Sequence, residues 1–212
     1  MSSDRVLVDN DVVFKLCAYA LHRVLIQADA FSPAFMLPAA GFVLRDLGRR
    51  SRRVRDRDAV AAALEEAIAA VQVVRPSDAA LSLAAELEDA ANTLSLDLDP
   101  GESQLLAVML VDGARLLLTG DKRAVVAMEA LARDDARGRV ASLEQVFIFL
   151  LGMQDVPDLR AAVCAEPGVD KAMTACFGCH SDTATHASVQ SGLESYLGAL
   201  RRAAPTVLSG QL

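Results

Sequence analysis

Apolar residues along the chain follow two patterns, short continuous runs and longer stretches with helical spacing. Short aliphatic runs at residues 5–9, 71–74, 115–119 and 139–142 are typical of buried strands. Between them, apolar positions recur every three or four residues, as in helices. This spacing predicts helices at residues 12–28, 33–47, 58–70, 77–92, 99–111, 122–133 and 143–151. The alternation predicts a helix-rich α/β fold with three layers (α/β/α) around a central parallel sheet.

The last sixty residues show no strand pattern and are expected to be a helical extension. Residues 186–202 form an amphipathic pattern in which Leu193, Leu197 and Leu200 share one face. Such a helix either packs the extension on the main domain or forms a homodimer. We therefore divide the chain into an α/β domain at residues 1–152 and an extension at residues 153–212.

Length and charge limit the possible functions. The 212 residues suffice for one full domain and an appendage, and the net charge of −7 argues against a broadly basic, nucleic-acid-binding surface. Residues 45–57 nevertheless contain seven arginines. This segment either binds an RNA backbone or is a solvated loop or a surface for an acidic partner, and charge patterning leaves these interpretations open.

Neither a secretion signal nor a membrane span is expected. The start, MSSDRV, contains an acid, and the later apolar segment at residues 12–26 is interrupted by Lys15, His22 and Arg23. Four cysteines in a chain of this length are not typical of a disulfide framework. These features favour a reducing, cytoplasmic location.

The extension contains a cysteine motif that allows three interpretations. Cys176, Cys179 and His180 spell the C-x-x-C-H of covalent haem attachment, which normally requires export. The same residues with His186 or Cys164 offer a zinc set that lacks a second matched pair. Ordinary buried or partly buried thiols are the interpretation we favour.

Three acidic residues from distant segments are expected at one edge of the sheet. Asp9 ends the first strand, and Asp121 follows the strand at residues 115–119. The helix that begins near Asp99 runs antiparallel to that strand, so Glu102 in its first turn starts at the same edge. Clustered carboxylates are costly without a cation, and an all-oxygen set suits Mg²⁺ or Mn²⁺. Lys122 could hold a phosphate beside this edge.

Each of these acids also has a purely structural interpretation. Asp99, Pro100 and Glu102 satisfy a helix start by themselves. Asp121 could serve only as a helix N-cap, and Asp9 only as a turn residue after a strand. Their combination with the sheet topology favours a shared metal site.

The order VLVDNDVVFKL, DPGESQLLAVML and LLLTGDKRAV resembles the PIN domain, an α/β family of metal-dependent ribonucleases that includes toxins of toxin–antitoxin pairs. The resemblance covers about residues 5–150. It implies that Asp9, Glu102 and Asp121 bind the metal, with Asp11 in a supporting position. PIN nucleases usually carry another acid on the second helical segment, whereas residues 33–44 of this chain are uncharged and Asp46 is the nearest candidate.

The resemblance implies a Mg²⁺- or Mn²⁺-dependent ribonuclease that cleaves RNA with a metal-activated water. Asp9, Glu102 and Asp121 would be catalytic, Asp11 would assist the metal, and Lys122 or Arg123 would steady the substrate phosphate. An antitoxin protein would be a further partner. The alternative is a catalytically impaired PIN-like scaffold that binds RNA or a protein through the arginine segment.

Overall fold

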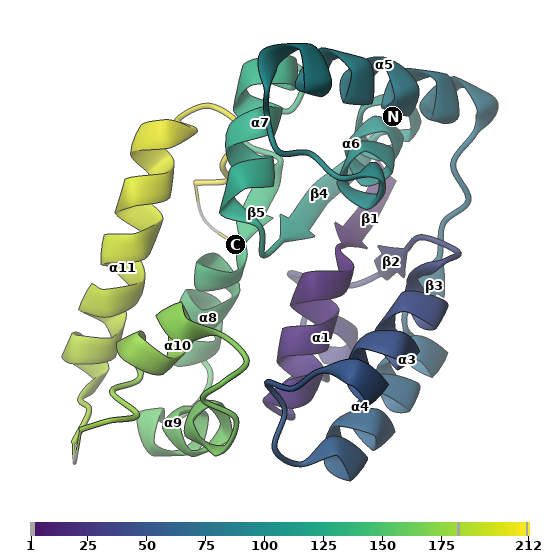
Figure 1. The fold of residues 1–212 in the computed structure, drawn as a ribbon. Coiled ribbons are helices and arrows are strands. Elements are labelled where there is room, and N and C mark those ends of the chain that lie inside the picture. The colour runs from purple at the N-terminus through teal and green to yellow at the C-terminus, as the bar shows by residue number, and fades with distance from the viewer. Residues whose placement is uncertain (1–2, 182, 211) are drawn as a thin grey trace.

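The computed structural model describes residues 3–181, 183–210 and 212 and has an α/β fold around a five-stranded parallel sheet (Figure 1). The strands lie in the order β3-β2-β1-β4-β5, and every neighbouring pair is parallel. Their bounds are Ser3–Val8 (β1), Ala34–Met36 (β2), Gln72–Val73 (β3), Ala114–Thr119 (β4) and Val140–Ser142 (β5). The predicted parallel sheet is confirmed.

Alternate residues of the central strands feed two separate cores, as the period of a strand requires. Val6 and Val8 point into one core and Leu7 into the other. The first core includes side chains of α1 (Asn10–Ala18), α2 (Val24–Gln27), α3 (Ala40–Arg50), α4 (Arg57–Ala70) and α8 (Leu143–Leu151). The second includes α5 (Asp78–Leu94), α6 (Pro100–Asp112) and α7 (Lys122–Ala132). Helices on both faces confirm the three-layer architecture.

The strand order reverses direction at β1. The chain steps outward from β1 to β2 and β3, then crosses back through α5 and α6 to β4 on the other side of β1. Parallel sheets bind ligands at such a switch point, outside the carboxyl ends of the strands. The segments after β1 and β4, which begin at Asp9 and Gly120, meet there.

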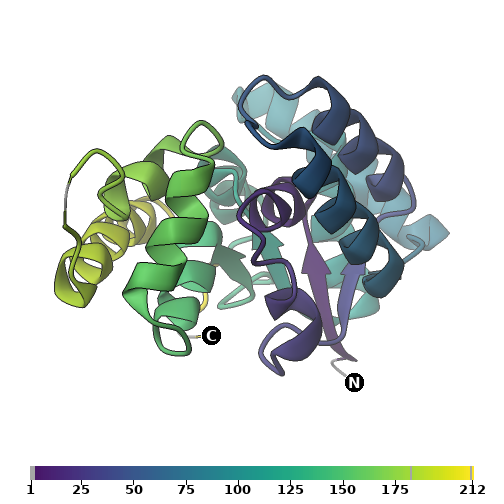
Figure 2. The same cartoon turned by 90° about the horizontal axis from the view of Figure 1, so that it is seen from below.

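The C-terminal extension is helical, as predicted, and packs on the β5 side of the molecule. It contains α9 (Val156–Ala165), α10 (Lys171–Cys176) and α11 (His186–Ala203). Figure 2 shows these helices, in green to yellow, grouped opposite the purple and blue helices that precede α5. Phe177 and Leu193 join the first core, so the extension shares buried side chains with the sheet.

The end of the chain returns to the sheet. Val140 of β5 forms a parallel bridge with Leu208, and the Glu129 carboxylate accepts hydrogen bonds from the Thr206 and Val207 N–H groups, both at 2.9 Å. The amphipathic helix predicted at residues 186–202 is present as α11, and its Leu193, Leu197 and Leu200 are buried.

The prediction of one helix at residues 33–47 is wrong at its start. Residues Ala34–Met36 form β2, which pairs with β1 through Val6↔Ala34. Ser32 and Pro33 therefore lead into a strand. A three-residue strand is too short to show a period of two, and its place is fixed by distant partners on β1 and β3.

The predicted helix at residues 12–28 is interrupted. The first helix ends at Ala18, and Ala20 adopts a left-handed conformation with φ 55° before α2 begins at Val24. A left-handed residue cannot continue a right-handed helix. Apolar residues on both sides of the break keep helical spacing, so the pattern alone conceals it.

The interpretation of the extension cysteines as thiols is wrong for Cys164 and Cys179, which form a disulfide. Their Cα atoms are 5.2 Å apart because α9 and the end of α10 pack together. The C-x-x-C spacing pointed to Cys176, which is instead a buried free thiol. The haem and zinc sets both lose the Cys179 thiolate in this oxidised form, and neither interpretation is retained.

A disulfide is commoner in oxidising compartments than in a reducing cytoplasm, so the cytoplasmic location remains a prediction. Within residues 3–181, 183–210 and 212, none of the helices combines the length and the apolar character needed to cross a membrane.

Candidate metal site at the carboxyl edge of the sheet

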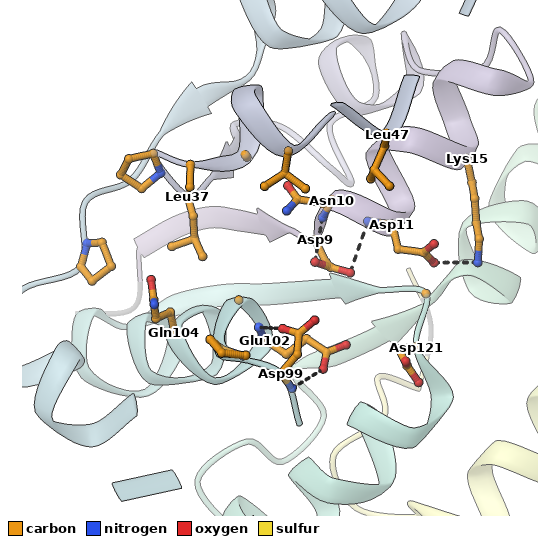
Figure 3. A pocket seen from close by; sticks show the side chains of 18 of the residues that line it. Asp9, Asn10, Asp11, Lys15, Leu37, Leu47, Asp99, Glu102, Gln104 and Asp121 are labelled. Carbon is orange, nitrogen blue, oxygen red and sulfur yellow. Dashed lines mark hydrogen bonds and ion pairs between the residues drawn. The ribbon is translucent and has the colours of Figure 1, made fainter. Parts of the chain in front are cut away.

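A cavity of about 940 Å³ lies at the switch point, outside the carboxyl ends of β1 and β4. The candidate acids Asp9, Asp11, Glu102 and Asp121 all line it, together with Asp99. Figure 3 shows the Asp9 carboxylate facing those of Asp99 and Glu102 across the cavity. The structure thus brings together residues that are more than a hundred positions apart in sequence.

Asp9 is delivered by the end of β1 and caps the first helix. Its carboxylate accepts hydrogen bonds from the Asn10 N–H at 2.7 Å and, more weakly, the Asp11 N–H at 3.4 Å. Burial, together with the negative charges of Asp11 and Asp99, raises the pKa of Asp9 to about 7. Within the part of the chain that the structure describes, no lysine or arginine forms an ion pair with this carboxyl group.

Glu102 lies in the first turn of α6 and is also buried. It forms a capping box with Asp99, in which the Glu102 Oε2 accepts from the Asp99 N–H at 3.0 Å and Asp99 Oδ1 accepts from the Glu102 N–H at 2.8 Å. Burial, followed by the charges of Asp99, Asp9 and Asp121, raises the pKa of Glu102 to about 8. The capping box fixes the position of Glu102. Its hydrogen bond from the Asp99 N–H lowers the pKa of Glu102 by less than burial and the neighbouring acids raise it.

Asp121 caps α7 and is more exposed. Burial alone would raise its pKa, but the Arg123 guanidinium and backbone N–H lower the pKa below its ordinary value. Arg123 Nη2 lies 3.1 Å from Asp121 Oδ2, and Arg123 Nη1 lies 3.4 Å from Asp97 Oδ2. The Arg123 side chain is 72% exposed, so it can move away at little cost.

Asp11 is held by a buried lysine. Lys15 Nζ lies 2.6 Å from Asp11 Oδ2 and 2.8 Å from Asp170 Oδ2, and Asp170 belongs to the extension. A Cβ at Gly120 would lie only 2.0 Å from Asp11 Oδ2. Gly120 therefore leaves room for the Asp11–Lys15 pair directly beside Asp121.

Lys122, a candidate phosphate ligand, lines the cavity but is also held. Its Nζ lies 2.6 Å from Glu144 Oε1, whose side chain is buried, and 4.5 Å from the centroid of the Tyr196 ring. Arg123 is consequently the more available of the two cations.

The wall of the cavity formed by α3 is apolar. Val43 and Leu47 line it, whereas Asp46, the nearest candidate for the additional acid that the PIN resemblance implies, does not. Asp46 instead pairs with Arg50 at 2.9 Å and Arg49 at 3.8 Å. The acidic set at this edge is therefore made by Asp9, Asp11, Asp99, Glu102 and Asp121.

The donor set fits a hard divalent cation by its chemistry. The pKa values of the Asp9 and Glu102 carboxyl groups are raised first by burial and then by neighbouring acids, and a cation would offset both effects. Among the residues that the structure describes, no three His, Cys, Asp or Glu side chains stand close enough to form a ready-made metal cage. Mg²⁺ is usually bound through one or two carboxylates and keeps several waters.

Sequence reasoning missed several residues of the site. Asp99 was identified only as a cap, although a capping box necessarily places it beside Glu102. The Asp11–Lys15 pair could have been found from its i, i+4 spacing on a helix. Asp170 and Glu144 carry no such signal, because their positions depend on how distant helices pack.

None of the arginines of residues 45–57 lines the acidic cavity, and the segment partly contacts the extension. The Glu166 carboxylate accepts from the Arg55 N–H at 2.6 Å and the Asp56 N–H at 2.7 Å. Arg45 pairs with Glu65. Four other arginines of this segment are exposed and form no ion pair among the described residues, namely Arg52, Arg53, Arg55 and Arg57. The structure leaves both interpretations of this segment open.

Comparisons with known proteins add no family: no protein-family model and no curated protein sequence matches the chain.

Proposed function

We propose that the protein is a PIN-like, Mg²⁺- or Mn²⁺-dependent ribonuclease that hydrolyses RNA phosphodiester bonds. The observation that carries the proposal is the pair of buried carboxyl groups, Asp9 and Glu102, whose pKa values are raised to about 7 and about 8 at the switch point of a parallel sheet. Titratable groups perturbed in this way, in a cavity, are typical of functional sites.

Asp9, Glu102 and Asp121 would hold the ion. The bound ion would supply an activated water and neutralise charge on the phosphate oxygens. Lys15 fixes the Asp11 carboxylate, so Asp11 would orient solvent at the site while remaining paired. Arg123 is exposed and pairs with Asp121. When Asp121 binds the ion, Arg123 would leave Asp121 and bind a substrate phosphate. Lys122 adds positive charge at the same edge.

A specific observation favours a second candidate, a catalytically impaired scaffold that binds RNA or a protein. Val43 and Leu47 form the cavity wall on the helix that would supply another acid in an active PIN nuclease, and Asp46 lies outside the cavity. The four exposed arginines between residues 52 and 57 would then provide the binding surface. An antitoxin partner, a homodimer and a cytoplasmic location remain predictions with either candidate.

Labelled RNA incubated with the purified protein tests the proposal. We expect cleavage with Mn²⁺, none with a chelator, and loss of cleavage in Asp121→Asn. The variant Asp158→Asn, which changes an exposed acid on α9, is the matched control and should cleave normally. Cleavage that persists in Asp121→Asn would refute the enzyme, whereas binding without cleavage by the native chain would favour the scaffold.

A further inference from the structure

A second, smaller groove adjoins the acidic cavity. It has a volume of about 430 Å³ and lies between the loop that joins α5 to α6, the start of α7, and α11 of the extension. Lys122 and Arg123 line both hollows. The two hollows therefore adjoin at these two side chains, and a ligand that contacts Lys122 and Arg123 borders both.

The groove has two chemically different ends. Its walls are mainly aliphatic and include Leu96, Val126 and Leu200. The cations Lys122 and Arg123 stand at the end shared with the acidic cavity. A flat apolar group joined to an anion matches this arrangement. The anion would lie near Lys122 and Arg123, on the side of the acidic cavity and of the metal ion proposed to bind there.

Tyr196 gives the groove an aromatic wall that core packing does not require. On α11, the buried positions are Val189, Leu193, Leu197 and Leu200, and Tyr196 lies outside that stripe with 39% of its surface exposed. The Lys122 ammonium, 4.5 Å from the ring centroid, is itself tied to the buried Glu144. The tyrosine ring is therefore held beside the first turn of α7, next to the acidic site.

We propose that this groove binds a nucleobase of single-stranded RNA adjacent to the phosphate that is cleaved, an inference that rests on the proposed ribonuclease function. A base has a flat apolar face that stacks on tyrosine regardless of its sequence, and its own phosphate would lie near Arg123. Bases in a duplex are already stacked and paired, so the groove selects unpaired RNA. The extension thereby supplies substrate selectivity to a site built by the sheet.

Tyrosine fluorescence measures this contact directly, because the chain has two tyrosines and no tryptophan. Tyr19 is fully buried in the core, so a ligand in the groove changes the emission of Tyr196. The titration uses a short oligouridylate in EDTA, which prevents cleavage. We expect the oligouridylate to quench the emission, and an abasic ribose-phosphate oligomer of equal length and charge to leave it unchanged. Equal responses to the two oligomers would overturn the proposal.

Binding of labelled oligouridylate, measured by fluorescence anisotropy in EDTA, provides the second test. Tyr196→Ala should weaken binding by about tenfold and Tyr196→Phe, which keeps the ring, by less than about threefold. Val73→Ala, at an exposed site outside both hollows, is the control and should bind normally. Unchanged affinity in Tyr196→Ala would contradict the proposal.

The fluorescence and anisotropy tests need neither a metal nor turnover, so their outcome is separate from that of the ribonuclease assay. Base-dependent quenching without cleavage would leave the nucleobase groove standing and refute only the nuclease. Cleavage without base-dependent quenching would support the nuclease and refute the nucleobase groove.

Discussion

Two kinds of largely buried carboxyl group differ in how their charge is satisfied. Glu129, Glu166 and Asp170, here called the anchoring carboxylates, tie the extension to the α/β domain. Asp9 and Glu102, here called the edge pair, face one another across the cavity (Figure 3). Both kinds are largely removed from water, so burial alone does not separate them.

The difference lies in the donors. Burial would raise the pKa values of Asp170 and Glu129, yet Lys15 and backbone N–H groups lower the first, and backbone N–H groups with Arg133 lower the second. The pKa values of the edge pair stay raised because burial acts on both groups and acidic neighbours add to it, with no cation to offset either effect among the described residues. Asp9 and Glu102 also accept backbone N–H groups, but these donors do not offset the burial and the neighbouring negative charges. Such a pair leaves room for an external cation.

Truncating an anchoring carboxylate should cause the largest loss of stability. Glu129→Ala leaves the Thr206 and Val207 N–H groups without their acceptor and opens a small cavity. We expect a decrease of about 3 kcal/mol in the free energy of unfolding, measured with urea. Glu86→Ala, at an exposed position on α5, is the control and should change stability by less than about 0.5 kcal/mol. A similar decrease in the free energy of unfolding in both variants would show that Glu129 does not anchor the extension.

The edge pair should make the metal-free protein less stable as pH rises. The folded protein keeps the protons of Asp9 and Glu102 up to pH values of about 7 and about 8, whereas unfolded carboxyl groups lose them near their ordinary pKa of about 4. The folded state thus binds more protons between about pH 4 and 8, so its stability falls across that window.

This pH dependence can be checked by urea unfolding in EDTA. Glu102→Gln keeps an acceptor for the Asp99 N–H but removes one titrating group. We expect the variant to be more stable than the native chain at pH 8.5 by on the order of 2 kcal/mol, with the difference shrinking toward zero as the pH is lowered below about 4. A variant that is less stable at pH 8.5 would show that Glu102 is an anchoring group.

Gly120→Ala should have the smallest effect. The new Cβ would lie 2.0 Å from Asp11 Oδ2, so the Asp11–Lys15 pair must shift. Asp11 is partly exposed and can give way, and we expect a loss of about 1 kcal/mol in stability. The same substitution at Gly210, where a Cβ meets nothing within 4 Å, is the matched control. Equal stabilities of the two variants would show that the pair is not packed against this turn.

Much of the sheet could be predicted from the sequence, because runs such as residues 115–119 are long enough to identify and because parallel strands share one edge. The convergence of Asp9, Glu102 and Asp121 on one cavity follows from that topology. The strand β2 could not be predicted, since its three residues carry too little pattern.

The remaining features depend on tertiary packing. The disulfide joins Cys164 to Cys179 instead of following the C-x-x-C spacing, because the packing of α9 on α10 decides which sulfur atoms meet. The contact of Asp170 with Lys15 likewise requires the extension to be docked. Short-range spacing identifies neither of these partners.

Binding of Mn²⁺ to the metal-free protein tests the central claim most directly. The electron paramagnetic resonance signal of free Mn²⁺ counts bound ions, and calorimetry at pH 7.5 in two buffers of different ionisation enthalpy counts released protons. We expect one ion per chain, with proton release from the edge pair, and weaker binding with less release in Glu102→Gln. Absence of binding, or binding that Glu102→Gln and Asp9→Asn both leave unchanged, would contradict a metal site at this edge of the sheet.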